Sequence, residues 1–378
     1  MRIHCLNDLS ALQSYAEVWN RMAAGVPFRS WEWLSTWWQH YGPSTGQDRH
    51  PRRLTVLCVV DERERPVGFA PLYSETTTAG GRVLRLLGDG EVCSEYLGIL
   101  ADPGREEAVA LAVVEHLADR FHASRTSPDR WDLMQFEAVD AGDAVLQPML
   151  SHLEQLGATV HRRPGPGCWR MELPDSWDAM LARLSKNQRR QIRRLLKANE
   201  KREVKTHLAT NRSELTTAFE HLVDLHRRRW QSRGLPGSFA SERFLAFHRE
   251  VTPQLLRAGQ LHMLWLEAEG KPLAADYQMV GAGNVYLYQS GIDPKRLAYE
   301  PGHLATALLL QRAIDHGFRW VDLLRGDEPY KAQWRAAFHN NASIRIVAPR
   351  TSARLRHQAW LAVRTAKDLA RCCLKTRP

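Results

Sequence analysis

The sequence predicts an α/β protein built from two domains of similar design, each with a mixed, mostly antiparallel sheet flanked by helices. Two observations predict this class. The chain has 378 residues, 44% of them apolar and 25% charged, which is typical of a globular protein long enough for two cores. The same order of elements, a hairpin followed by a strand, a helix and a last strand, is indicated twice. We therefore expect one α/β domain to have been duplicated.

The two hairpins are the clearest repeated elements. In the first half, the apolar run 54–60 is followed by a charged turn and by Pro66, which opens a second apolar run. In the second half, the apolar run 261–266 is followed by a charged turn and by Pro272, which opens the run 273–280. Proline suits the first position of a strand, because it cannot donate a hydrogen bond within the ladder. Both segments are therefore predicted to be antiparallel hairpins.

A helix and a strand follow each hairpin. Segments 106–120 and 303–316 carry apolar residues three and four positions apart, the spacing of a helix with one buried face. Each is followed by an apolar strand that begins with Arg-Trp, at 130–136 and at 319–325. Ahead of the first hairpin, tryptophans at 31, 33, 37 and 38 have helical spacing, and we expect them in the core of the first domain.

The turn-rich stretch 162–167 predicts the seam between the halves, because no regular element is expected to run through it. We therefore expect an N-terminal domain at 1–165, a C-terminal domain at 166–349 that holds the active site, and a basic helix or tail at 350–378. Beyond the seam, Ser185 and Gln188 have the spacing of a capping box, which predicts the start of a helix.

The net charge of +10 comes from two local segments. Segment 183–205 contains ten Lys or Arg and two Glu, and segment 350–378 contains eight Lys or Arg and one Asp. Such a total does not by itself indicate a nucleic-acid-binding protein, which needs a coherent basic face. The first segment has three interpretations: a solvated face, a clamp on an anionic sugar nucleotide, coenzyme or tRNA, and a membrane-surface contact.

Several features limit the function class and the compartment. The chain lacks the GxGxxG, P-loop, HExxH and GxSxG motifs, which disfavours the commonest dinucleotide, nucleotide, zinc-protease and serine-hydrolase classes. Its six cysteines form no CxxC pair, so we expect reduced thiols and no metal. No signal peptide or membrane span is indicated. We expect a cytoplasmic protein whose amphipathic basic tail contacts the inner face of the membrane or a membrane-bound synthase; packing onto the body is the alternative.

Several segments resemble the GNAT superfamily of N-acyltransferases. The most specific is DLLRGDEPYKAQW at 322–334, and weaker matches lie at 186–194 (KNQRRQIRR) and 226–230 (HRRRW). Within the superfamily, residues 5–345 look like the CelD-like branch, associated with cellulose and exopolysaccharide biosynthesis, and like the related Fem-type peptidyl transferases. The resemblance implies two tandem GNAT-like domains. It also implies transfer of an acetyl or other acyl group from coenzyme A to an amine of a cell-envelope or glycan-precursor acceptor.

Two alternatives stay open beside acyl-CoA chemistry. One is a Fem-type aminoacyl transferase that takes its donor from charged tRNA, which the basic segment 183–205 favours. The other is a binding module whose domains have lost their chemistry. The expected coenzyme A cradle is the loop that leads into the helix at 303, with Lys295, Arg296, Gly302 and His303 as its residues, because helix N-termini bind phosphate. The match is partial, since Tyr299 and Leu304 stand where the family has Arg or Gln and a small residue.

The resemblance also implies proton-transfer residues. Tyr330 corresponds to the tyrosine that protonates the leaving thiolate in many GNAT enzymes, and Glu328 or Asp327 would accept a proton from the attacking ammonium. Asp276 interrupts an apolar strand, so it either lines a cleft or pairs with a buried partner. For an anionic acceptor or phosphate the candidates are His226, Arg229, Trp230, Arg325 and Lys331. The alternatives are a packing face for the first three and a cluster of salt bridges for the last two.

Overall fold

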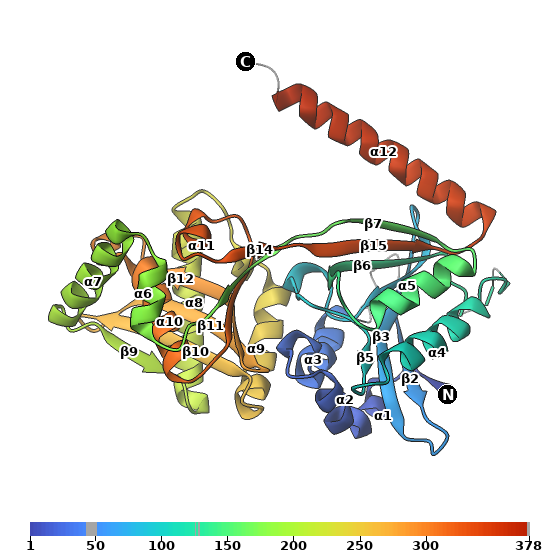
Figure 1. The fold of residues 1–378 in the computed structure, drawn as a ribbon, viewed down its shortest axis with the longest axis horizontal. Helices are drawn as coiled ribbons and strands as arrows, with labels where there is room; N and C mark the ends of the chain where they lie inside the picture. The colour runs from blue at the N-terminus through green and yellow to red at the C-terminus, as the bar shows by residue number, and fades with distance from the viewer. Residues whose placement is uncertain (43–50, 125, 128, 376–378) are drawn as a thin grey trace. The chain divides into compact units, whose positions relative to one another are not determined.

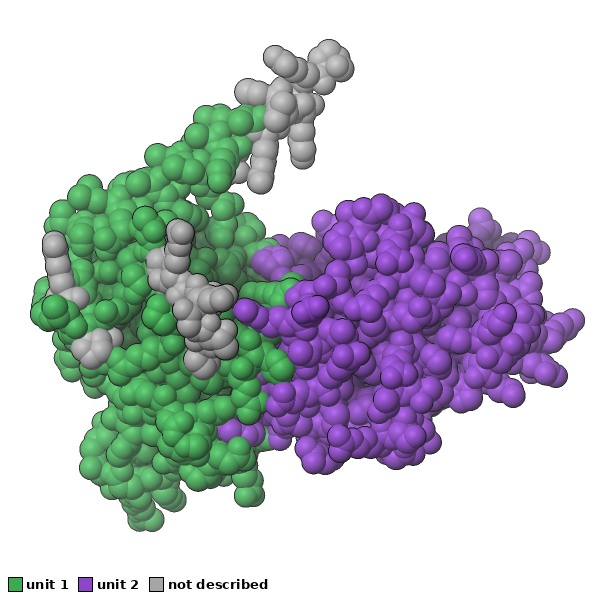
Figure 2. All heavy atoms as spheres, turned by 180° about the vertical axis from the view of Figure 1, so that it is seen from behind, with its two compact units in different colours: residues 1–23, 37–165, 341–378 green, residues 24–36, 166–340 purple. Residues whose placement is uncertain are grey.

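The structure, a computed structural model, describes residues 1–42, 51–124, 126–127 and 129–375 and divides into two compact units (Figures 1 and 2). Unit 1 consists of 1–23, 37–165 and 341–378, and unit 2 of 24–36 and 166–340. Each unit has one mixed, mostly antiparallel sheet flanked by helices, which confirms the predicted fold class. Within the described residues, no helix is both long enough and apolar enough to span a bilayer.

The sheet of unit 1 has eight strands. Its main path is β1 (Arg2–Leu6), β2 (Arg53–Val60), β3 (Pro66–Thr77), β4 (Gly81–Leu86), β6 (Leu133–Asp140), β15 (Asn341–Val347) and β7 (Thr159–Pro164), and β5 (Leu100–Ala101) pairs with β3. The expected first hairpin is β2–β3, with Val60 opposite Pro66. Only β4 and β6 pair in parallel among these described strands. The helices are α1 (Leu9–Leu12), α2 (Ala16–Met22), α4 (Glu106–Ala118), α5 (Leu146–Gln155) and α12 (Thr351–Lys375).

The sheet of unit 2 repeats this layout. Its strand order is β14 (Ala337–His339), β8 (Cys168–Glu172), β13 (Trp320–Arg325), β12 (Asn284–Ile292), β11 (Lys271–Gly281), β10 (Leu261–Ala268) and β9 (Lys205–Leu208). The second expected hairpin is β10–β11, and β12–β13 is the parallel pair. The helices are α6 (Trp177–Arg183), α7 (Lys186–Lys201), α8 (Arg212–Gln231), α9 (Glu242–Arg257), α10 (Pro301–Asp315) and α11 (Pro329–Gln333).

After residue 165 the chain passes from unit 1 to unit 2, and at residue 341 it returns to unit 1. Strand β7 belongs to unit 1 and the next strand, β8, to unit 2, whereas β14 belongs to unit 2 and the next strand, β15, to unit 1. In each sheet, the strand before one crossing of the chain pairs with the strand after the other crossing. These pairs are β15–β7 in unit 1 and β14–β8 in unit 2. The seam predicted at 162–167 is therefore not free of regular structure, because β7 runs to Pro164 and its ladder with β15 extends to that residue.

The tryptophan helix is α3 (Trp31–Tyr41), and its four tryptophans are buried as expected. They do not share one core, however. Residues up to Thr36 cluster with unit 2, where the Trp33 ring packs edge-on against Phe247 with centroids 4.9 Å apart. Sequence spacing predicted the buried face of this helix but could not indicate which core would receive each ring.

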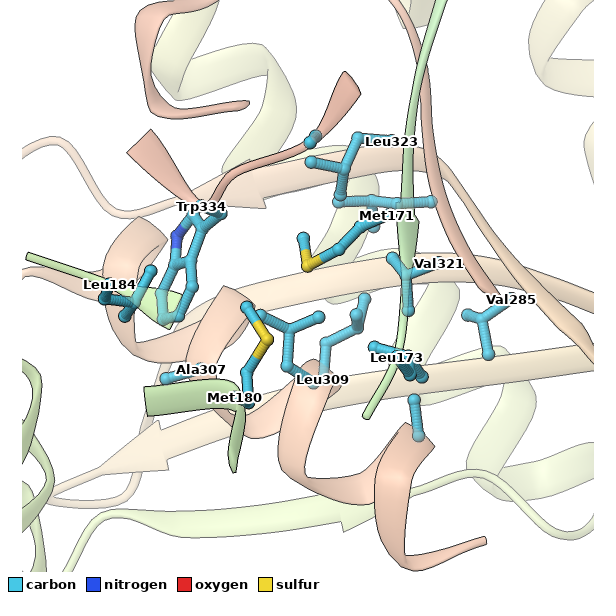
Figure 3. Packing of buried hydrophobic residues seen from close by; sticks show 14 of the residues in the cluster. Met171, Leu173, Met180, Leu184, Val285, Ala307, Leu309, Val321, Leu323 and Trp334 are labelled. Atoms are coloured by element: carbon cyan, nitrogen blue, oxygen red, sulfur yellow. The ribbon is translucent and has the colours of Figure 1, made fainter. Parts of the chain in front are cut away.

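The core of unit 2 lies between its sheet and the helices α6 and α10. Figure 3 shows Met171 of β8, Leu173 just after it and Val321 of β13 packed against side chains from both helices. Helix α7 begins with the predicted capping box: the Ser185 hydroxyl accepts from the backbone N–H of Gln188, whose side chain accepts from the Ser185 N–H.

Candidate active site

A pocket of about 200 Å³ lies in unit 2 beyond the short parallel pairing of β12 and β13. That pairing covers the three positions from Asn284–Trp320 to Tyr286–Asp322. Ligands of α/β sheets commonly bind beyond the carboxyl ends of such strands. The pocket is lined by residues of α8, β11, β12, the start of α10, the loop into α11 and the start of α11: Arg229, Asp276, Leu287, Ser290, Ile292, Gly302, His303, Ala305, Thr306, Glu328 and Tyr330.

The N-terminus of α10 forms one wall of the pocket. Pro301 is the first residue of this helix, and Leu304 makes the first backbone bond of its ladder, to the carbonyl of Glu300. The N–H groups of Gly302 and His303 precede that bond, so the helix itself gives them no acceptor. A Cβ added at Gly302 would meet no atom within 4 Å. The helix start is therefore open to a ligand, and its dipole favours an anion.

Asp276 is a buried carboxylate on β11, 6% exposed, and stands opposite Ser290 of β12. Burial raises the pKa of its carboxyl to about 7, although a hydrogen bond with Gln278 and the charge of Arg229 both act to lower it. At neutral pH the group is therefore divided between its acid and its base form. A carboxyl with this property can accept a proton from an amine and release it again.

Arg229 of α8 reaches the same pocket. Its guanidinium lies 3.4 Å from the Ser290 hydroxyl, to which it donates. Its Nε is buried and, among the described residues, has no hydrogen-bond partner. Burial and the nearby Arg233 lower its pKa, and the negative charges of the pocket raise it. A buried donor without an acceptor is costly unless a ligand supplies one.

Glu328 ends the loop after β13 and is the N-cap of α11, and Tyr330 is the second residue of that helix. Burial, assisted by the charges of Glu328 and Asp276, raises the pKa of the Tyr330 phenol, so that its hydroxyl is protonated at neutral pH. Glu328 is about half exposed and forms an ion pair of 3.0 Å with Lys331. The pocket therefore holds the protonated phenol of Tyr330 together with the carboxyl of Asp276, whose pKa is about 7.

Lys331 does not line the pocket. Its side chain is 2% exposed, and its ammonium donates to the carbonyls of Leu324, Arg325 and Gly326 at 3.2, 2.7 and 3.2 Å. These bonds tie α11 to the end of β13. The lysine therefore fixes the start of α11, the helix that carries Tyr330.

Two of the expected cradle residues lie outside the pocket lining. Lys295 is exposed, and the Arg296 guanidinium donates to the carbonyl of Ala268 and to the carboxylate of Glu269, the latter at 2.9 Å. Arg296 also stacks on Tyr299, 4.7 Å from the ring centroid. It therefore holds the cradle loop against the β10–β11 turn, and Gly302 and His303 are the cradle residues that reach the pocket.

The remaining predicted residues also lie outside the lining. His226 is buried against Phe239, and burial lowers the pKa of its ring to about 4, so the ring is neutral. Trp230 packs beside it and carries Arg233 over its face. Asp327 is exposed, and Arg325 is half-buried at the end of β13. Of the thirteen predicted residues, the lining contains six: Arg229, Asp276, Gly302, His303, Glu328 and Tyr330.

Sequence reasoning missed several lining residues. Ser290 faces Asp276 across the β11–β12 ladder, and Thr306 stands one helical turn beyond Gly302, to whose carbonyl its hydroxyl donates at 2.9 Å. The spacing of Thr306 from Gly302 was a usable signal, because residues four apart share a helix face. A β-bulge at Tyr277–Gln278 shifts the register of β12, so a count along the sequence could not have paired Ser290 with Asp276.

Comparison with known proteins identifies a domain match and a similar fold. Residues 186–332 match the acetyltransferase (GNAT) domain family, and that segment contains every lining residue. The structure is similar to the crystal structure of FemX, with a TM-score of 0.60, 11% identity, and coverage of 91% of this chain and 97% of that one. No curated protein matches the sequence.

Two further solved structures resemble the chain over nearly its full length. One is the C-terminal domain of a putative lysylphosphatidylglycerol synthetase from Agrobacterium fabrum, with a TM-score of 0.53, 9% identity, and coverage of 94% of this chain and 96% of that one. The other is L-PGS from Bacillus licheniformis, with a TM-score of 0.50, 11% identity, and coverage of 95% and 96%. At these identities the likeness concerns the fold.

Proposed function

We propose that the protein is an N-acyltransferase that moves an acyl group from coenzyme A to an amine in the pocket of unit 2. The observation that supports this most is that one pocket contains an open helix N-terminus together with Asp276 and Tyr330. Asp276 is suited to accept a proton and Tyr330 to donate one. The match of residues 186–332 to the acetyltransferase (GNAT) domain family supports the same reaction class.

The donor would bind through its pyrophosphate at the start of α10. The N–H groups of Gly302 and His303, which receive no acceptor from the helix ladder, would donate to phosphate oxygens, and the absence of a side chain at Gly302 lets the oxygens approach. Arg229, whose buried Nε has no acceptor within the described part of the chain, would donate to an oxygen of the donor or to a carboxylate of the acceptor.

The reaction would proceed by direct attack of the amine on the thioester carbonyl. Asp276 in its ionised form takes the proton of the incoming ammonium, the C–N bond forms, and the C–S bond breaks. Tyr330 donates its proton to the departing thiolate and is reprotonated from solvent. The nitrogen loses two protons in all, one to Asp276 before attack and one to solvent as the amide forms. The thiol gains one proton from Tyr330 and Asp276 returns its proton to solvent, so the transfer releases one net proton and balances without a metal or redox partner.

A second candidate is aminoacyl transfer from charged tRNA. Helix α7 has seven Lys or Arg residues and one Glu, and it contacts the loop before α10: the Gln191 amide donates to the Glu300 carboxylate at 3.0 Å. A basic helix beside the helix start would suit a donor with many phosphates. The fold similarity to FemX is compatible with this candidate.

The acceptor is the least constrained part of the proposal. The CelD-like resemblance favours an amine of a glycan or cell-envelope precursor, and this remains a prediction. The pocket adds one constraint, because the half-buried guanidinium of Arg229 would favour an acceptor that carries a carboxylate or phosphate close to its amine.

Titration calorimetry with acetyl-CoA tests the donor. The wild type should bind, and Gly302→Ile should weaken binding at least about tenfold, because the side chain would fill the space before the helix N–H groups. Ser213→Ile is the matched control, since Ser213 is exposed and is also the second residue of its helix, α8.

Failure of the wild type to bind acetyl-CoA at millimolar concentration would overturn acyl-CoA dependence. Binding of charged tRNA that weakens steeply with salt would then favour the second candidate. Reversal of the charges at Arg190, Arg193 and Lys197, which are exposed on α7, should abolish tRNA binding if that candidate is right.

A further inference from the structure

Helix α12, at the C-terminal end of unit 1, presents an apolar stripe to solvent. Leu355, Val363 and Leu369 are 65%, 56% and 63% exposed. In an α-helix these positions fall within one face, together with the exposed alanines at 359, 362, 366 and 370. Figure 1 shows the helix (red) leaving the end of β15, with its C-terminal half extending beyond the strands of unit 1.

The opposite face of the helix is held by unit 1, so the orientation of the stripe is determined. The Trp360 ring stacks on His357 and lies 4.1 Å from the Arg345 guanidinium of β15. Ala353 is buried in a small cluster with core residues of unit 1, and Arg356 forms an ion pair of 3.1 Å with Asp132. Because this face is occupied, the stripe faces away from the sheet.

Helix α12 is also basic. Its 25 residues include six Lys or Arg and one Asp. Lys367 is exposed and, at helical spacing, stands at the margin of the stripe beside Val363. A basic helix with an exposed apolar face fits the interface of an anionic bilayer, where the apolar side chains enter the acyl boundary and the cations contact lipid phosphates.

We propose that α12 attaches the protein to anionic lipid bilayers through the stripe of Leu355, Val363 and Leu369. The bilayer is favoured over a second copy of the chain, because two copies of this helix, each with six Lys or Arg and one Asp, would repel one another. An anionic lipid surface supplies both an apolar layer and the compensating charge. Attachment of this kind is peripheral and reversible, and it goes beyond the proposed function, on which it does not depend.

Vesicle co-sedimentation of the full chain tests the proposal. Vesicles containing phosphatidylglycerol should carry the wild type down, whereas pure phosphatidylcholine vesicles should not, and the bound fraction should fall as salt is raised. The triple variant Leu355→Asp, Val363→Asp, Leu369→Asp should lower the partition coefficient at least about tenfold. Its unfolding midpoint should match that of the wild type, because all three side chains are exposed.

The matched control carries three equivalent substitutions elsewhere: Leu111→Asp, Leu156→Asp and Leu235→Asp, which also replace exposed leucines. It should sediment like the wild type. Equal binding of the stripe variant and the wild type, or equal binding to neutral and anionic vesicles, would overturn the proposal. Light scattering that shows a wild-type dimer, dissociated by the stripe variant, would instead assign the stripe to a second copy.

Discussion

Asp276 is the residue whose chemistry depends most on the fold around it. As an isolated carboxylic acid it would be ionised at neutral pH. On β11, with strands on both sides and α8 contacting the same sheet, it loses water and its pKa rises to about 7. The proposed reaction needs the ionised form, so activity should increase as the pH rises through this value. The raised pKa of Asp276 therefore leads to one prediction about the pH dependence of kcat and one about the free energy of unfolding.

The kinetic prediction concerns Asp276→Asn. We expect kcat to fall roughly 10²–10⁴-fold, because a general base is lost, with acetyl-CoA affinity nearly unchanged. The wild-type pH profile should show a limb that rises near pH 7, and this limb should be absent from the variant. Asp322→Asn is the control, because Asp322 is a buried carboxylate paired with Arg170 outside the pocket. If Asp276→Asn keeps the rising limb of the wild-type pH profile, Asp276 is not the general base.

The thermodynamic prediction follows from the same pKa. Below about pH 4 the carboxyl is protonated in both the folded and the unfolded chain. Between pH 4 and 7 the unfolded chain releases this proton while the folded chain keeps it, so the free energy of unfolding falls as the pH rises. The loss amounts to at most about 4 kcal/mol for this group and levels off above pH 7. Urea unfolding at a series of pH values should show a smaller decline in Asp276→Asn than in the wild type. Identical slopes would contradict the raised pKa.

At the scale of elements, the loop from β13 into α11 depends on one buried ammonium. Lys331 satisfies three carbonyls and pairs with Glu328. Lys331→Met keeps the approximate length of the side chain but removes the ammonium that donates to those carbonyls. We therefore expect a loss of about 2–4 kcal/mol in the free energy of unfolding. Lys295→Met, at an exposed site in the same unit, should change it by less than about 0.5 kcal/mol.

These two lysine variants also separate a structural from a binding role. If Lys331 acts by fixing the loop, Lys331→Met should lower stability and weaken turnover together, and a compact cation added to the assay should not restore activity. Wild-type stability with a raised KM for the acceptor would instead assign Lys331 to substrate binding.

The elements that the sequence predicted are those whose signals are local. Both proline-started hairpins, the two helices that follow them and the capping box at Ser185 are confirmed, since each depends on residues within a few positions of one another. Asp276 and Gly302 were recognisable for a similar reason, one as a charge in an apolar run and one as a glycine at a helix start. Lys331 was grouped with the binding residues because its burial depends on a loop that no short-range pattern describes.

At the scale of the whole molecule, strand exchange limits what a linear reading can predict. The sequence suggested consecutive domains followed by a tail, but β15 lies in unit 1, between β6 and β7. This pairing joins residues about 200 positions apart, such as Ile346 and Met134, and period-two alternation carries no information on which sheet a strand will enter. The duplicated layout was predictable, whereas the assignment of each strand to a unit was not.

The position of β15 in the sheet of unit 1 leads to a prediction about truncated chains. A chain ending at residue 340 would keep every strand of unit 2 but lose β15, whose Ile344, Ile346 and Val347 are each at most 1% exposed. Burial of such side chains is worth about 1.5–3 kcal/mol each, and β6 and β7 would also lose the ladder between them. That sum is comparable with the entire stability of a typical domain, so unit 1 should fail to fold.

A chain ending at residue 350 is the matched comparison, because it keeps β15 and also Arg350, which donates to the backbone carbonyl of Trp131 at 2.6 Å. We expect the 1–350 chain to be soluble and to unfold cooperatively. The 1–340 chain should lose the protected amides of β6 and β7 in hydrogen exchange while β10–β12 of unit 2 stay protected. If instead 1–340 protects β6 and β7 as well as 1–350 does, β15 contributes little to unit 1. The exchanged strand would then be an addition to a sheet that is stable without it.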